Sequence, residues 1–178
     1  MIVCAGRNEI FDFARPIGVG LLESTINLTK IVIKEKPTSL TFIGSAGSYG
    51  NYKIFDIVHS KTASNIELCF LENKCYTPLE RIISSKETLN VSHETLNIVN
   101  SSNYITTDDV SSKKFLTQGV ELENMEFFAL LNISKEFDIP VNGIFVVTNY
   151  CDKNAHNDFI KNHSKAKQLL TKYMKEIK

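Results

Sequence analysis

Short apolar runs alternate along this chain with longer segments of helical periodicity, and this alternation restricts the fold more than any other feature. Residues 2–5, 40–43 and 144–147 are apolar runs, and the first two each end at a glycine. Runs of this length bounded by glycine are typical of buried strands. Residues 21–36 and 157–177 carry apolar side chains three or four positions apart, which predicts helices. Strands that alternate with helices predict an α/β fold, a three-layer sandwich with a central mixed sheet.

Further elements follow from the same patterns. Residues 54–58 and 66–71 are predicted as strands, and residues 122–137 as a helix. Residues 73–103 are rich in Ser, Thr and Asn, with one apolar stretch formed by Leu96, Ile98 and Val99. On the first helix, the apolar stripe is predicted to contain Leu22, Ile26, Thr29 and Ile33. Because no linker or repeat interrupts the pattern, residues 1–178 are predicted to form one domain.

Charge and hydropathy limit the partners of the protein. Lys plus Arg and Asp plus Glu both number 20, so the formal net charge is zero. This balance argues against a nucleic acid or a membrane surface as the main partner. No apolar stretch approaches the ~20 residues that span a bilayer, and the first residues lack the features of a signal peptide. A cytoplasmic location is therefore expected.

The four cysteines are Cys4, Cys69, Cys75 and Cys151. No pair has the CxxC spacing of a zinc or redox site. Cys4 and Cys151 lie in or beside apolar strand-like runs, so both are predicted to be buried free thiols. A reducing compartment agrees with this cysteine usage, and neither a metal nor an organic cofactor is expected.

Three predicted strands end in residues suited to ligand binding. The first is followed by Gly6 and Arg7, the second by the run Gly44-Ser45-Ala46-Gly47, and the last by Thr148 and Asn149. Ligands of α/β sheets bind at the carboxyl ends of the strands, so these segments are predicted to share one rim. The glycine-rich run matches neither a dinucleotide-binding motif nor a P-loop. It is either a plain turn or a segment whose backbone amides contact an anion.

Two carboxylates, Glu121 and Glu123, stand one residue apart at the start of the helix predicted for residues 122–137. A buried carboxylate carries a large desolvation cost, but its two oxygens can accept hydrogen bonds from the neighbouring hydroxyls of a ribose. The alternative is a solvated helix start that complements the helix dipole. Asn149 offers both a donor and an acceptor to a purine, or is a turn residue. His163 is either a ligand contact or a core histidine.

Taken together, these segments resemble the purine nucleoside phosphorylase and nucleosidase superfamily. The glycines of Gly18-Val19-Gly20, the run Gly44-Ser45-Ala46-Gly47 and Asp56-Ile57-Val58 are similar to a series of family motifs at nearly matching spacing. Val120-Glu121-Leu122-Glu123 is similar to the Val-Glu-Met-Glu motif of the family. Thr148-Asn149 stands where many members have Ser-Asp, and this Thr-Asn version is similar to the phosphorylases that act on 6-oxopurines. The resemblance covers most of the chain outside residues 73–103.

The resemblance implies a role for each matching residue. It implies that Asn149, Tyr104 and Ile105 contact the purine base, and that Asn149 is the catalytic group. It implies that Glu121, Glu123 and His163 contact the ribose. It implies that Gly6, Arg7 and Ser45 contact phosphate. It also implies a homo-oligomer based on a dimer or a trimer. The expected function is phosphorolysis of the N-glycosidic bond of a (6-oxo)purine nucleoside, with inorganic phosphate as co-substrate.

Two departures from the family pattern leave alternatives open. The chain is shorter than typical members, mainly between Gly6 and Gly18. Phosphorylases with the Val-Glu-Met-Glu motif usually carry an Arg where Phe42 stands, and a phosphate dianion needs such a cation. Arg7 or Arg15 would have to replace it. The alternatives are a nucleosidase that uses water, with Glu9 as the base, and a non-catalytic nucleoside-binding relative.

Overall fold

The computed structural model describes residues 1–86 and 97–177. Its strands are β1 (Ile2–Cys4), β2 (Arg15–Pro16), β3 (Leu40–Ser48), β4 (Ile57–Ser60), β5 (Thr62–Ser64), β6 (Ile82–Ser84), β7 (Ile98–Ser101), β8 (Val120–Asn124) and β9 (Val141–Tyr150). Its helices are α1 (Gly20–Glu35), α2 (Leu68–Leu71), α3 (Asp109–Thr117), α4 (Phe127–Phe137) and α5 (Ala155–Glu176), with a 3-10 turn, η1 (Arg7–Glu9). All nine strands belong to one mixed sheet, in which both parallel and antiparallel pairs occur.

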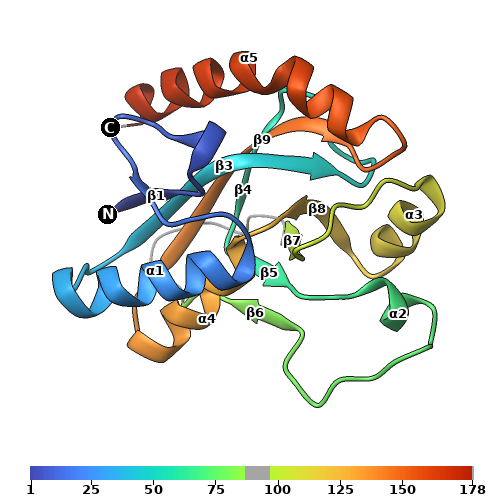
Figure 1. The fold of residues 1–178 in the computed structure, drawn as a ribbon, viewed down its shortest axis with the longest axis horizontal. Coiled ribbons are helices and arrows are strands. Elements are labelled where there is room, and N and C mark those ends of the chain that lie inside the picture. Colours follow the sequence, from blue (N-terminus) through green and yellow to red (C-terminus); the bar gives the residue numbers. More distant parts are fainter. Residues whose placement is uncertain (87–96, 178) are drawn as a thin grey trace.

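The helices cover both faces of this sheet (Figure 1). Alternate residues of the long central strands point to opposite faces, because the side chains of a strand alternate. Phe42 and Phe145 pack in the core beneath α1 and α4. Ile43 and Ile144 pack in the core beneath α5, with Ala166 and other α5 residues. The α/β sandwich with a central mixed sheet is thus confirmed.

The register of the sheet brings the predicted rim together. β1 pairs with β3 in parallel, and β9 pairs with β3 in parallel along the other edge. β8 is antiparallel to the end of β3, where Gly47 lies opposite Glu123, and Gly47 is also the partner of Asn149 on β9. The carboxyl ends of three parallel strands therefore meet at one edge, as predicted. The run Gly44–Gly47 lies within β3, however, and is not a turn or loop that follows it.

The helix predicted over residues 122–137 is wrong in its first part. Residues 120–124 form strand β8, and α4 begins only at Phe127. Glu121 and Glu123 are therefore on a strand, not at a helix start, since the apolar Val120 and Leu122 alternate with them. The strand predicted over residues 66–71 is also wrong, because α2 occupies Leu68–Leu71. The strands β5 and β6 and the helix α3 were not predicted.

The apolar stripe predicted for the first helix lies on its exposed side. Leu22, Ile26 and Ile33 are 72%, 54% and 61% exposed, whereas the buried residues are Gly20, Ser24, Leu28, Ile31 and Val32. Ser24 can face the core because its hydroxyl donates to the carbonyl of Gly20, at 2.6 Å. A small polar residue with an internal partner thus takes a place that hydrophobic periodicity assigns to apolar side chains.

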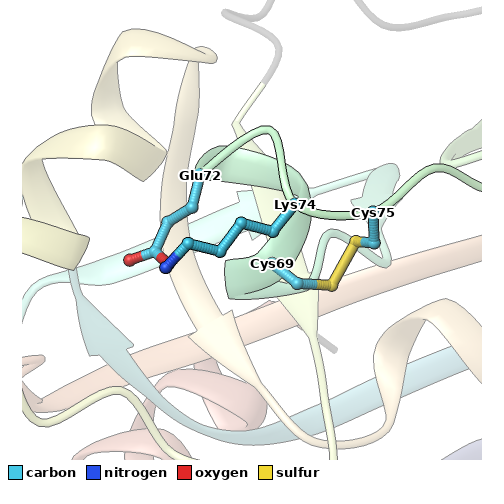
Figure 2. Close-up of a disulfide and its surroundings, with 4 residues drawn as sticks. All are labelled: Cys69, Glu72, Lys74 and Cys75. Atoms are coloured by element: carbon cyan, nitrogen blue, oxygen red, sulfur yellow. A yellow bond between two sulfur atoms is a disulfide. The ribbon is translucent and has the colours of Figure 1, made fainter.

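Cys69 and Cys75 form a disulfide, which the sequence did not predict. The bond links α2 to the segment that follows it, and Lys74 and Glu72 form an ion pair beside it (Figure 2). Cys4 and Cys151 are buried free thiols, as predicted. Disulfides are rare in reducing compartments, so the cytoplasmic location, which stays a prediction, loses the support of the cysteine usage. Among the described residues, no helix has the length and apolar character needed to cross a membrane.

Candidate active site

A pocket of about 280 Å³ lies at the carboxyl ends of β1, β3 and β9. Residues from seven parts of the chain line it, and they include three carboxylates, Glu9, Glu123 and Glu126. Three of its lining residues were predicted as phosphate contacts: Gly6, Arg7 and Ser45. Asn149 and Ile105 line it as well. The structure therefore brings together most of the predicted site residues, from segments more than 100 positions apart in the sequence.

Glu9 enters the pocket from η1. The backbone N–H of Ser45 on β3 donates a hydrogen bond to Oε1 of Glu9, at 2.9 Å. The turn is fixed by its own backbone, since the N–H of Glu9 donates to the carbonyl of Gly6 at 2.9 Å. A side chain of α5 also holds the η1 turn, because Nε2 of His163 lies 2.8 Å from the carbonyl oxygen of Asn8. Because a carbonyl only accepts, that nitrogen of His163 carries the proton.

Glu126 is the most buried carboxylate of the pocket, with 2% of its surface exposed. It stands directly before α4, and the N–H of Gly20 donates to its Oε1 at 2.9 Å. Burial raises the pKa of Glu126 to about 8, and the negative charge of Glu9 adds to this shift. The hydrogen bond from Gly20 acts in the opposite direction. Glu126 is therefore a neutral acid at pH 7, able to donate as well as accept a hydrogen bond.

Asn149 lies at the end of β9 and is 6% exposed. The hydroxyl of Thr148 donates to its Oδ1 at 2.9 Å, and its Nδ2 donates to the carbonyl of Tyr150 at 3.0 Å. Each atom of the amide keeps capacity for one more hydrogen bond. Gly47 makes room for this side chain, because a Cβ there would lie 3.0 Å from Nδ2 of Asn149 and 2.7 Å from Sγ of Cys151.

Glu123 also borders the pocket, but protein groups occupy its carboxylate. The backbone N–H of Thr106 donates to Oε1 at 2.9 Å, and the hydroxyl of Tyr49 donates to Oε2 at 2.8 Å. Burial raises the pKa of Glu123, and the hydrogen bonds from Thr106 and Tyr49 oppose that shift. A carboxylate held in this way has less capacity for a ligand than Glu126.

Comparison of the sequence with models of known protein families places this chain in one of them. The model of the phosphorylase superfamily matches residues 17–178. The chain belongs to the phosphorylase superfamily. No curated protein sequence gives a significant match to this superfamily member.

Solved structures with the same fold include several nucleosidases. A mutant of Helicobacter pylori MTAN, with 5′-methylthioadenosine in its active site, has a TM-score of 0.81 at 14% identity, over 98% of this chain and 95% of the other. The futalosine hydrolase of H. pylori has a TM-score of 0.80 at 16% identity, over 98% and 94%. The MTA/SAH nucleosidase of Streptococcus pneumoniae, in complex with 8-aminoadenine, has a TM-score of 0.77 at 12% identity, over 97% and 95%. At these identities the likeness establishes the fold alone.

Three predicted site residues lie outside the pocket lining. Glu121 is tied to the side chain of Asn51, whose Nδ2 donates to its Oε2 at 2.7 Å. Tyr104 is 81% exposed and borders a neighbouring pocket. His163 stacks on Phe159, a lining residue, with ring centroids 5.1 Å apart, and holds the η1 turn. The roles assigned to these residues by the resemblance stay predictions.

The sequence interpretation missed Glu126, although a pattern for it was present. The motif Val-Glu-Met-Glu was matched to residues 120–123, but its last two residues recur unchanged at Met125-Glu126, three positions later. Both of these residues line the pocket. Phe159 and His156 of α5 were missed too, since nothing in the local sequence of a long amphipathic helix sets them apart.

Within residues 1–86 and 97–177, no cluster of three or more His, Cys, Asp or Glu side chains could hold a metal ion. The absence of a cofactor, the homo-oligomer and the use of phosphate stay predictions.

The raised pKa of Glu126 predicts a pH-dependent stability. Between pH 4.5 and about 8 the folded protein keeps a proton on Glu126 that the unfolded chain releases. The folded state then binds more protons, so its stability falls as the pH rises through this range. We expect the contribution of Glu126 to change by as much as ~4 kcal/mol. Urea unfolding at pH 5 and pH 8.5 measures the change, and Glu126→Gln should remove most of it. An equal change in Glu126→Gln would contradict this prediction.

Proposed function

We propose that this protein hydrolyses the N-glycosidic bond of a purine nucleoside, with Glu9 as the general base. One observation carries the proposal: the backbone N–H of Ser45, which the resemblance assigns to phosphate, donates to the carboxylate of Glu9 at 2.9 Å. A carboxylate in that place can take a proton from water, and it repels a phosphate dianion by like charge.

The cations of the protein support the same choice. Arg7 is the single lysine or arginine among the described residues that line the pocket. Its side chain is 69% exposed, and its Nη2 lies 3.1 Å from Oε1 of Glu23. Arg15, the other candidate for phosphate, pairs with Glu35 at 3.3 Å and does not line the pocket. Neither arginine offers the free, inward-facing guanidinium that a phosphate dianion requires.

The proposed chemistry divides the reaction among three side chains. Glu9 removes a proton from the attacking water, whose oxygen forms the new bond to C1′ of the ribose. The bond between C1′ and the purine nitrogen breaks at the same carbon, and its electron pair leaves with the purine. Glu126 binds a ribose hydroxyl and so fixes C1′ relative to the water, which is the positional contribution to catalysis.

Asn149 stabilises the leaving purine. Its amide donates a hydrogen bond but cannot transfer a proton, so the base leaves with negative charge that solvent then neutralises. A 6-oxopurine spreads this charge onto its exocyclic oxygen, within reach of the same amide. We therefore propose 6-oxopurine nucleosides, such as inosine and guanosine, as the preferred substrates.

Phosphorolysis is the second candidate, and one observation favours it. Gly6, Arg7 and Ser45, the three residues predicted to contact phosphate, do line one pocket. If Arg7 left Glu23 and turned inward, these residues would surround an anion.

One assay separates the candidates. The purified protein is incubated with inosine or guanosine, with and without inorganic phosphate, and free base and ribose are quantified. We expect free ribose at equal rates in both buffers. Ribose 1-phosphate formed only in the presence of phosphate would establish phosphorolysis and overturn the proposal. Nucleoside binding without release of base would leave a non-catalytic binding protein.

A further inference from the structure

A second pocket, of about 370 Å³, adjoins the first. The two pockets share Ile105 and Glu123 as lining residues, so they lie on either side of the same short wall. The second pocket extends from this wall toward α2 and α3, and its lining includes Ile66, Leu68 and Phe115. The reaction proposed above uses no part of it.

The register of β3 shows which end of a nucleoside would face this pocket. Ser45 contacts Glu9, the proposed base for water, and so marks the reacting end. Gly47, two residues further along β3, lies opposite both Asn149 and Glu123. Asn149 is the proposed partner of the purine, and Glu123 is part of the shared wall. The second pocket therefore begins beyond the base and not beyond the ribose.

The lining of the second pocket selects the kind of group that it can hold. Its apolar lining residues include Ile66, Leu68, Ile105 and Phe115. Its ionisable lining residues are the carboxylates Glu67 and Glu123 and the phenol of Tyr104. Among the described lining residues there is no Lys, Arg or His. Burying an anion here would carry a desolvation cost without an opposite charge, so an uncharged apolar group fits best.

A disulfide and ion pairs hold the side of this pocket that α2 forms. Cys69, one of its lining residues, is held by the disulfide to Cys75. Glu72, which directly follows α2, forms ion pairs with Lys74, at 2.8 Å, and with Lys114 of α3, at 3.2 Å, and the second of these ties the end of α2 to α3. A pocket whose walls are already fixed binds a ligand with a smaller loss of conformational entropy.

We propose that the second pocket receives an uncharged apolar substituent on the six-membered ring of the purine. The protein then acts on purine nucleosides that are alkylated or arylated at an exocyclic position of the base, in addition to the unsubstituted ones. This inference rests on the proposed function, because that function supplies the orientation of the base.

Binding of free bases tests the pocket without catalysis. Dissociation constants are measured by calorimetry for adenine and N6-benzyladenine, and for guanine and N2-benzylguanine. We expect one benzylated base to bind about tenfold more tightly than its parent, because the ring buries apolar surface. Leu68→Trp, which fills the second pocket from its rim, should abolish this gain and leave binding of the parent base unchanged.

Leu79→Trp is the matched control, since Leu79 is 75% exposed and lines neither pocket. It should keep the gain. Equal or weaker binding of both benzylated bases, or an undiminished gain in Leu68→Trp, would overturn the inference. A gain that Leu68→Trp removes, in a protein that hydrolyses no nucleoside, would establish the pocket and refute the hydrolytic function. If neither parent nor benzylated base binds, the inference is wrong, whereas the hydrolytic function is decided separately by the release of ribose from inosine or guanosine.

Discussion

Replacement of Glu9 by glutamine is expected to lower kcat for inosine hydrolysis by roughly a thousandfold, the usual range for loss of a general base. Glutamine keeps the size of the side chain and can still accept the hydrogen bond that the N–H of Ser45 donates at 2.9 Å. It cannot take a proton from water. Because the glutamine side chain at this position leaves the contacts to the ribose and the purine intact, KM should change by less than threefold. Steady-state kinetics at pH 7 measure both constants.

Asp12→Asn is the matched control for this variant. Asp12 lies three residues after Glu9 in the same segment, is exposed, and does not line the pocket. The substitution removes one negative charge from the segment that carries Glu9 and leaves the carboxylate of Glu9 in place. We expect a kcat within twofold of the wild type. A similar loss in Asp12→Asn would attribute the effect to overall charge, and full activity in Glu9→Gln would exclude Glu9 as the base.

The fold was predictable where the pattern of apolar residues coincides with the buried faces. β3, β9 and α5 were found because each is long and packs on the centre of the sheet. Short edge elements were not found. β6 has three residues and α2 has four, too few for a periodicity of two and of 3.6 residues to be told apart.

The candidate site was predictable as a location more than as a set of contacts. Parallel strands end on one rim, and this rule is enough to place Gly6, Ser45 and Asn149 together from their positions in the sequence. The rule does not say which carboxylate of a strand remains free for a ligand. That depends on Thr106 and Tyr49, whose hydrogen bonds occupy Glu123. Tyr49 lies 74 residues from Glu123 in the sequence, so no local pattern reveals this competition.

Gly47 has one interpretation from the sequence and a different one from the structure. In the sequence it is the last glycine of a run that suggested an anion-binding loop. In the structure it is a strand residue whose missing Cβ leaves space for Asn149 and Cys151, which a methyl group would meet at 3.0 and 2.7 Å. The glycine is required by a side chain about 100 residues away and not by a turn. The glycine motif therefore coincides with the pocket for a physical reason other than the one that the sequence suggested.

Replacement of Asn149 by alanine is expected to lower kcat for inosine hydrolysis by about 10²-fold to 10³-fold, the usual loss when one donor to a developing anion is removed. The amide has two protein partners, Thr148 and Tyr150, and its remaining donor capacity would meet the purine. Stabilisation of the leaving group matters only where that group leaves poorly. With p-nitrophenyl β-D-ribofuranoside, whose leaving group needs no such help, the same variant should lose less than tenfold.

This difference between substrates distinguishes a catalytic amide from a structural one. A variant that merely distorts the end of β9 would lose activity on both substrates alike. Both substrates contain the same ribosyl group, and Glu9 and Glu126 act on that group. Asn157→Ala is the matched control, since Asn157 is exposed on α5 and does not line the pocket. It should behave as the wild type with both substrates. Equal losses on inosine and the nitrophenyl riboside in Asn149→Ala would refute a role for this amide in departure of the base.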